Sequence, residues 1–386
     1  MNHILATKNL LSGLLLCLLF IACGLVTETS GASDVGTGQQ RLFIVGQDLG
    51  SIRDYYDSAC CVKPDGNTAY INLYNMLSEQ HVFSGLGIDA KGNPLDIEAD
   101  TGAGLANVWK TAIDFPGGLA IGLELVENQH PGALAQLIAG EYDDHIEHLA
   151  RFMKLIDETV WLRVGYEFDG MWNQGYGNPG QYKQAYIHVV DKLREARVEN
   201  VEFVWQASTS PVDDMIEKRF EDISTWYPGD AYVDWVGTSW FLTIDESPAV
   251  DTDYKPASQR ELTDQVLEFA RLRGKPVMIA EASPQGYDLA DNFNANIAPI
   301  WDGKQKGDRE NLSDSDIWDA WYAPLFKYMN DNGDVIRALA YINANWDAQS
   351  RWGAPHNEGY WGDSRLEANP EIARRFNLAI SDWRGR

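Results

Sequence analysis

The chain has 386 residues, enough for one large domain or two ordinary ones, and its 45% hydrophobic content excludes global disorder. Its formal net charge of −26 argues against nucleic acid as a partner, because an acidic surface repels a polyanion. Its 14 tryptophans could stack on sugar rings or fill a core, so their number alone decides nothing.

The first residues have the pattern of an export signal. Lys8 is the only charged side chain before an apolar run that ends at Ala22 and is too short to span a bilayer, which predicts a signal peptide over 1–22. Ala22 followed by Cys23 resembles a bacterial lipobox, so a lipid anchor at Cys23 is expected, with 23–40 as a polar tether. We therefore expect an outer-membrane or cell-surface lipoprotein. Ordinary export to the periplasm or medium is the alternative.

Two cysteines remain outside that segment, and they are neighbours. Cys60 and Cys61 could close an eight-membered disulfide ring or stay as two thiols, and the thiol state is the one we expect. The sequence contains no CxxC or HExxH pattern. We therefore predict no catalytic metal and no cofactor.

From residue 41 onward, short apolar runs alternate with amphipathic stretches, as in parallel strands joined by helices. Strands are expected over 41–47, 69–74, 118–125, 160–167, 201–208, 232–241, 275–283 and 335–343, and helices over 143–156, 181–196 and 260–272. Eight strands alternating with helices predict an α/β fold, a (β/α)8 TIM barrel in a single domain over 41–386. A doubly wound open sheet is the alternative fold. It would normally have a Gly-rich phosphate-binding loop after its first strand, but the sequence there, GQDLGSI, lacks the GxGxxG spacing.

Chemistry in such a barrel collects at the carboxyl ends of the strands, where two glutamates stand out. Glu167 ends the fourth run among apolar neighbours such as Phe168 and Trp172, which penalise its charged form and suit a proton donor. Glu281 ends the seventh run. One protonated and one ionised carboxyl group suit glycoside hydrolysis, although each glutamate could instead merely pair with Arg163.

Other polar and aromatic residues near these strand ends are candidates for binding a sugar chain. The candidate substrate-binding residues are Arg163, Tyr166, Trp172, Gln206, Trp240 and Trp346. Trp172, Trp240 and Trp346 would offer aromatic faces to the sugar rings, and Gln206 would donate to Glu281.

Three segments in the correct order resemble glycoside hydrolase family 26, a family of clan A. Residues 163–172, RVGYEFDGMW, match the pattern Arg-Pro-x-His-Glu on strand four, 227–234 match Tyr-Pro-Gly-Asp-x-Tyr-Val-Asp, and 275–281 match the Lys-Pro segment before the nucleophile. The resemblance covers about 140–346. It implies Glu167 as general acid/base and Glu281 as nucleophile of a retaining, endo-acting hydrolase of a β-linked polysaccharide, resembling a β-mannanase.

Two departures leave the polymer open. Tyr166 stands where the family has His, and Trp240 and Phe241 stand where it has a Tyr beside the nucleophile. Mannan, β-1,3-xylan, mixed-linkage glucan and algal galactan all remain candidate substrates. We expect the protein to be a monomer. The alternatives are a transglycosylase, which uses the same glutamates, and a non-catalytic cell-surface glycan-binding lipoprotein on the same scaffold.

Overall fold

Eight parallel strands close into a barrel in the computed structural model, which describes residues 40–241, 255–295, 309–352 and 361–385. The barrel order is β1-β13-β9-β8-β7-β6-β5-β2. These strands are β1 (Leu42–Gly46), β2 (Gly66–Asn72), β5 (Gly118–Glu124), β6 (Val160–Val164), β7 (Val201–Ala207), β8 (Trp235–Trp240), β9 (Val277–Ala282) and β13 (Ile336–Ile342). The predicted (β/α)8 fold and its eight strands are confirmed.

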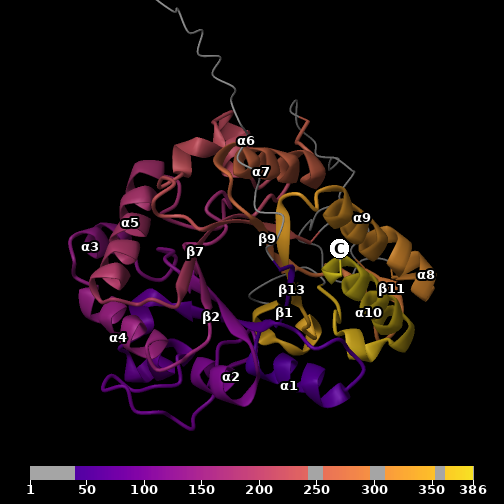
Figure 1. Ribbon diagram of the computed structural model, residues 1–386, viewed down its shortest axis with the longest axis horizontal. Helices are drawn as coiled ribbons and strands as arrows, with labels where there is room; N and C mark the ends of the chain where they lie inside the picture. The colour runs from indigo at the N-terminus through magenta and orange to yellow at the C-terminus, as the bar shows by residue number, and fades with distance from the viewer. Residues whose placement is uncertain (1–39, 242–254, 296–308, 353–360, 386) are drawn as a thin grey trace, which may run out of the picture. The chain divides into compact units, whose positions relative to one another are not determined.

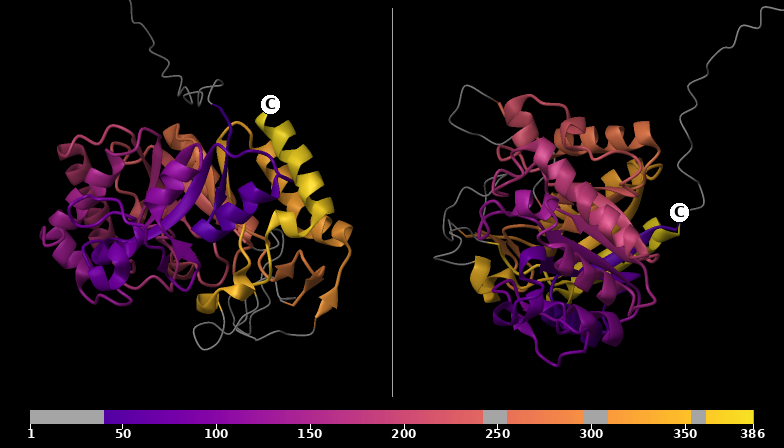
Figure 2. Two further views of the ribbon diagram at one scale, coloured as in Figure 1. Left: turned by 90° about the horizontal axis from the view of Figure 1, so that it is seen from below. Right: turned by 90° about the vertical axis from the view of Figure 1, so that its left-hand side faces the viewer.

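Helices surround the strands, as Figure 1 shows and the side views of Figure 2 repeat. They are α1 (Leu49–Ser58), α2 (Val108–Asp114), α3 (Ala133–Ile138), α4 (Asp143–Met153), α5 (Pro179–Glu195), α6 (Met215–Arg219), α7 (Gln259–Arg273), α8 (Asp314–Ile317), α9 (Ala323–Asp331) and α10 (Pro370–Arg384). Short helical turns occupy Leu73–Asn75, Glu79–Gly85, Ile223–Trp226, Trp318–Tyr322, Trp346–Ala348, Ser350–Trp352 and Leu366–Ala368. Two-residue strands lie in the loops: β3 (Ala99–Asp100), β4 (Leu105–Ala106), β10 (Tyr287–Asp288), β11 (Phe293–Asn294) and β12 (Glu310–Asn311).

The helices begin and end where side chains satisfy their free backbone groups. Asn178 caps α5 ahead of Pro179, and Ser258 forms a reciprocal capping box with Glu261 at the start of α7. α7 ends at Gly274, which adopts the left-handed conformation at φ +62°. The three predicted helices over 143–156, 181–196 and 260–272 are confirmed as α4, α5 and α7, with small shifts at their ends.

Alternate side chains of the barrel strands separate into two environments. The inward apolar residues form one cluster near the amino ends of the strands: Ile44, Ala120, Trp161, Val204, Trp235, Met278, Ala280, Ala338 and Ala340. The outward residues pack under the helices in a larger core that includes Trp205 and Trp240. Above the inner cluster, toward the carboxyl ends of the strands, the inward positions become polar.

β9 interrupts this alternation with a bulge. Thr238 on β8 pairs with Ile279, but the next residue, Ser239, pairs with Glu281, so Ala280 is an extra residue in β9. Ala280 lies in the inner apolar cluster, and Glu281, the next residue, also points inward to contact Arg163. The bulge therefore turns Glu281 into the barrel at the level of Ser239.

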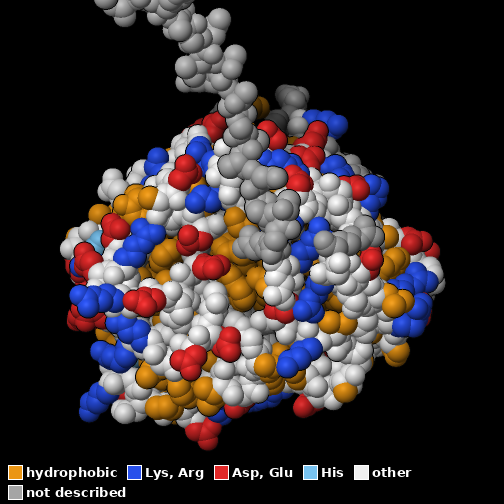
Figure 3. Space-filling view, viewed as in Figure 1, with side chains coloured by type: hydrophobic (Ala, Val, Ile, Leu, Met, Phe, Trp, Pro, Cys, Tyr) orange, Lys and Arg blue, Asp and Glu red, His pale blue; other side chains and the backbone are white. Residues whose placement is uncertain are grey.

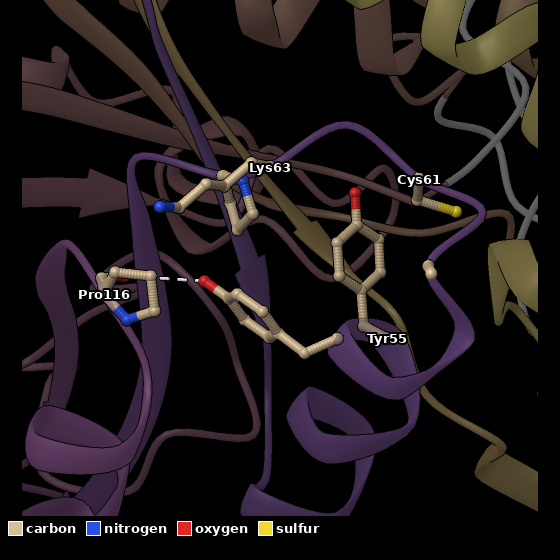
Figure 4. A pocket seen from close by; sticks show the side chains of 7 residues that line it. Tyr55, Cys61, Lys63 and Pro116 are labelled. Carbon is tan, nitrogen blue, oxygen red and sulfur yellow. Dashed lines mark hydrogen bonds between the residues drawn. The ribbon is translucent and has the colours of Figure 1, made fainter.

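Cys60 and Cys61 form a disulfide, so the expectation of two free thiols was wrong. Asn377 of α10 fixes the chain on either side of it, donating to the carbonyl of Cys60 at 2.7 Å and accepting from the N–H of Val62 at 2.9 Å. Beside the disulfide lies a hollow of about 330 Å³ whose lining includes Tyr55, Cys61, Lys63 and Pro116 (Figure 4). Because Lys63 and Pro116 precede β2 and β5, this hollow lies at the amino ends of the strands, opposite the predicted site.

The surface carries charges of both signs. On the face shown in Figure 3, Lys and Arg side chains lie between Asp and Glu side chains, so the net charge of −26 is not gathered there in one acidic patch. Within the described ranges, no helix is both long and apolar enough to cross a membrane. The predicted signal peptide, the tether up to residue 39 and Cys23 lie outside the described residues, so export, lipid anchoring, the domain boundaries and the monomer remain predictions.

Candidate active site

An ion pair between Glu281 and Arg163 lies at the centre of the polar layer inside the barrel. Nη1 of Arg163 donates to Oε1 of Glu281, and it also donates to Oε1 of Gln206 at 3.0 Å. Both charged side chains are buried, Arg163 completely. β6, β7 and β9 are thus tied together by one guanidinium group, which has five N–H donors and no acceptor.

Two tyrosines enclose the guanidinium group of Arg163. Its Cζ atom lies 4.7 Å from the ring centroid of Tyr70 and 5.1 Å from that of Tyr166. Such contacts stabilise a desolvated cation through the negative faces of the rings. Gly122 on β5 leaves the space for this packing, because a Cβ atom there would come within 2.6 Å of the Tyr70 ring and 2.9 Å of Nη2 of Arg163.

Glu167 reaches the same layer through an unusual backbone turn. Gly165 has φ +54° and Glu167 has φ +55°, and the left-handed region is rare for a non-glycine residue. The chain therefore turns sharply after β6 and brings the Glu167 side chain into the barrel mouth, where it is buried. Oε1 of Glu167 accepts a hydrogen bond from Oγ of Ser239 at 2.9 Å.

The surroundings of Glu167 favour its protonated form. Burial is the largest cause that raises the pKa of Glu167 well above its usual value, and the negative charge of Glu281 acts in the same direction. The hydrogen bond from Ser239 lowers that pKa, but by less. The site therefore combines a glutamate whose protonated form is favoured with a glutamate paired with arginine.

A buried aspartate pair fixes the loop that carries Glu167. The carboxylate of Asp169 accepts hydrogen bonds from the backbone N–H groups of Ser208 at 2.5 Å and Thr209 at 3.3 Å. These bonds attach the loop after β6 to the end of β7. Asp214 caps α6, and burial together with the charge of Asp169 raises the pKa of Asp214 to about 9. Asp214 is therefore protonated at neutral pH and can share its proton with Asp169, which relieves the repulsion between two buried carboxylates.

The structure brings five of the eight predicted site residues into this layer: Glu167, Glu281, Arg163, Tyr166 and Gln206. Trp172 lies beside it, in the loop that follows Glu167. Its indole is 42% exposed and rests against Gly170, where a Cβ atom would come within 2.6 Å of the ring. This residue therefore offers an aromatic face to solvent near the barrel mouth.

The other two tryptophans do not offer a free face to a sugar. Trp240 is 1% exposed and packs against Tyr328 of α9 with ring centroids 5.1 Å apart, because its position on β8 points outward. Trp346 is 2% exposed and forms a cluster with Trp352 and Trp361, and its Nε1 donates to Ser283 and Ser364. Both residues are therefore structural here, which corrects the prediction that they act as sugar platforms.

Ser239 and Asp169 are the site residues that the sequence pattern did not reveal. Trp240 and Phe241 draw attention to the end of β8 and carry no hydroxyl group, whereas the hydroxyl that enters the barrel belongs to the preceding Ser239. Strict alternation from Trp235, which points inward, would have predicted Gly237 and Ser239 on the same face. Asp169 was visible in the sequence only as an acidic neighbour of Glu167.

A closed parallel barrel with two buried glutamates at the carboxyl ends of β6 and β9 is an arrangement suited to a glycoside hydrolase that works with two carboxyl groups. Residues 123–281 match the family model described as Glycosyl hydrolase family 26. Over this segment, and over the barrel that contains it, the chain is similar to glycoside hydrolase family 26.

Two curated proteins are similar to most of the chain. The chain is 35% identical over 344 residues to the β-1,3-xylanase TXYA of Vibrio sp, covering 88% of this chain and 65% of the relative. It is 34% identical to a β-1,3-xylanase of Alcaligenes sp, covering 88% and 63%. The chain thus spans slightly less than two thirds of the length of these relatives.

Two solved mannanases share the fold at low sequence identity. A family 26 β-mannanase from Bacteroides ovatus gives a TM-score of 0.52 at 13% identity, covering 90% of each chain. A double mutant of a Cellulomonas fimi endo-β-1,4-mannanase gives 0.53 at 14% identity, covering 89% of this chain and 71% of the other. At this identity the likeness concerns the barrel and not the substrate.

Proposed function

We propose that this chain is a retaining, endo-acting glycoside hydrolase that cuts a β-linked polysaccharide by double displacement. The observation that carries the proposal is the contrast between its two buried glutamates. Burial and the charge of Glu281 raise the pKa of Glu167 and so favour its protonated form, whereas Glu281 is paired with Arg163. A site that must donate a proton and attack a carbon needs these two forms side by side.

The proposed reaction has two steps with a covalent intermediate. In the first, a carboxylate oxygen of Glu281 attacks the anomeric carbon while the glycosidic bond breaks and Glu167 gives its proton to the leaving oxygen. In the second, Glu167 takes a proton from water, whose oxygen attacks the same carbon and releases Glu281. Each carboxyl group therefore returns to its starting form, and no metal or cofactor enters the scheme.

β-1,3-Xylan is the first polymer to test, because the curated relatives that cover most of the chain are named β-1,3-xylanases. Mannan, mixed-linkage glucan and algal galactan remain in the panel, since the two mannanases share only the fold. Cleavage within the chain rather than from its end is proposed by analogy with the family. Export, with a lipid anchor at Cys23, would place the enzyme where it meets such polymers.

The non-catalytic binding protein is not favoured by the arrangement inside the barrel. A glycan-binding surface needs aromatic faces and hydrogen-bonding groups, such as those at Trp172. Binding a glycan does not require a buried ion pair next to a buried glutamate. Burying these groups costs desolvation free energy, and binding alone gives no reason for that cost.

The deciding experiment is a product assay of the soluble form, residues 24–386, against β-1,3-xylan, β-mannan, mixed-linkage glucan and algal galactan. We expect a series of oligosaccharides from one polymer from the earliest times, as internal cleavage requires. Release of only the smallest product would show that the enzyme cuts from the chain end, and the proposed endo action would be wrong. Retention on a polymer in an affinity gel without any release would reject the enzyme in favour of the binding protein.

Trp172→Ala is expected to raise KM for the polymer about 2- to 10-fold with little change in kcat, because the exposed indole offers stacking energy to a sugar ring remote from the bond cleaved. Steady-state kinetics on the polymer measure both constants. Leu378→Ala on α10 removes another exposed apolar side chain and is the matched control. A fall in kcat with KM unchanged would place Trp172 outside substrate binding.

A further inference from the structure

We infer that Ser239 is a positioning residue that directs the acidic proton of Glu167 onto Oε2, through a chain of hydrogen bonds that starts at Arg163. The inference rests on the proposed function, in which Glu167 is the proton donor. It concerns a residue that neither the sequence pattern nor the family resemblance singled out. The chain runs from Arg163 through Gln206 and Ser239 to Glu167, and each link has a direction that the chemistry of the groups determines.

The first link sets the orientation of the Gln206 amide. Arg163 has only donors, so the amide atom 3.0 Å from its Nη1 must be the acceptor, Oε1. The NH2 group of Gln206 then faces the other way, 3.1 Å from Oγ of Ser239 and 3.4 Å from Oε1 of Glu281. Gly237 leaves room for this side chain, because a Cβ atom there would come within 2.8 Å of the Gln206 Cβ.

The second link sets the direction of the Ser239 hydroxyl. Its oxygen already accepts a hydrogen bond from Gln206, so its own hydrogen is free to point to Oε1 of Glu167 at 2.9 Å. A hydroxyl that donates to Oε1 requires that oxygen to be the acceptor. A protonated Glu167 therefore carries its proton on Oε2, the oxygen that Ser239 does not touch.

The backbone holds Ser239 in the place that this chain of bonds requires. Its carbonyl oxygen accepts hydrogen bonds from Oγ1 of Thr209 at 2.9 Å and from Nε2 of Gln259 at 3.2 Å. The bulge in β9 sets Ser239 opposite Glu281 in the register of the two strands. Gln206 contacts both Ser239 and Glu281, which couples the position of the acid to that of the nucleophile.

Several groups besides Ser239 act on the titration of Glu167. The charges of Glu281 on β9 and Asp169 in the loop after β6 raise the pKa of Glu167, and the charge of Arg163 on β6 lowers it. The charge of Glu167 in turn raises the pKa of Tyr70 on β2 and of Tyr176 in the loop before α5. None of these contacts is made by the Ser239 hydroxyl. Removing that hydroxyl should therefore shift the pKa of Glu167 in one direction, upward, because the hydrogen bond it donates favours the ionised acceptor.

The test compares Ser239→Ala with the parent on two aryl glycosides of the sugar found in the polymer assay, one with a good and one with a poor leaving group. We expect kcat/KM to fall about 10-fold for the poor leaving group and by less than about 3-fold for the good one, because only the poor one needs the directed proton. The alkaline limb of the pH profile should move up by about 1 unit. Ser239→Thr keeps a hydroxyl and should restore both.

Thr238→Val is the matched control, because it removes a buried hydroxyl from the neighbouring position of β8. That hydroxyl contacts Thr209 and the backbone carbonyl of Ser239 but neither glutamate. The variant should leave the leaving-group ratio and the alkaline limb unchanged, whatever its effect on stability. Equal slowing of both substrates by Ser239→Ala, with an unmoved alkaline limb, would reduce Ser239 to a packing role and overturn the inference.

A second readout separates this inference from the proposed function. In protein labelled with 13C at the glutamate carboxyl carbons, the Glu167 signal is assigned by its loss in Glu167→Gln, and its titration is followed without any substrate. If the parent cleaves no polymer, the proposed function fails, but this titration still decides the inference. An upward shift in Ser239→Ala that Ser239→Thr reverses supports the hydrogen bond, and identical titrations in all three proteins reject it.

Discussion

Glu281→Ala is expected to lower kcat on the polymer by at least about 10^4-fold, because the variant has no oxygen to attack the anomeric carbon. Steady-state product release measures this loss. Azide added with an aryl glycoside should restore turnover of the variant, since the small anion fits the vacated space and attacks in place of Glu281. The product would be the glycosyl azide of inverted configuration, because a single displacement replaces the double one.

The fold of this variant needs its own control, because Arg163 loses its partner and a buried unpaired charge is costly. Glu281→Gln keeps an oxygen that can accept from Nη1 of Arg163 and should unfold close to the parent temperature while remaining inactive. Substantial hydrolysis by a folded Glu281→Gln protein would contradict the nucleophile assignment.

Glu167→Ala is expected to slow hydrolysis of the polymer about 10^2- to 10^4-fold, but to slow formation of the covalent intermediate from an activated aryl glycoside much less. The reason is that only a poor leaving group needs a proton as it departs. Kinetics over a series of leaving groups measure the effect as a steeper dependence on leaving-group acidity. Azide should here give the glycosyl azide of retained configuration, because it attacks the intermediate on Glu281.

The matched control for Glu167→Gln is Glu202→Gln, which changes a carboxylate inside the same barrel near the amino ends of the strands. Glu202 accepts the indole N–H groups of Trp161 at 3.1 Å and Trp235 at 2.6 Å, and a glutamine oxygen can replace it. The control should keep the parent dependence on leaving groups. If Glu167→Gln slowed good and poor leaving groups equally, its role as the acid would be lost.

Much of the fold was predictable because it depends on local patterns. Strands buried on both faces must be nearly continuous apolar runs, and eight such runs alternating with capped amphipathic helices are typical of few architectures. Glu167 and Glu281 were predictable as residues at the carboxyl ends of two of those runs. Gln206 followed from the same reasoning, whereas Arg163 was suggested by the family resemblance.

The errors came from contacts between segments that are distant in sequence. Trp240 and Trp346 were expected at the sugar site because tryptophan near a strand end suits stacking, but α9 covers Trp240, and Trp346 packs in a cluster with two other indoles. Neither contact leaves a signal in the local sequence. The disulfide is a different case, because Cys60 and Cys61 are neighbours and the sequence left their pairing open as an alternative.

The sequence by itself determined the barrel, its strand ends and the two glutamates, because apolar periodicity and the residue types at strand ends act over a few neighbouring positions. Only the tertiary structure decided how these glutamates meet. The bulge in β9 turns Glu281 inward, the left-handed turn at Gly165 and Glu167 carries the Glu167 side chain into the barrel, and Ser239 on a third strand donates to Glu167. A one-residue shift in strand pairing moves a side chain to the opposite face, and that shift is set by the neighbouring strands rather than by the residues of β9 alone.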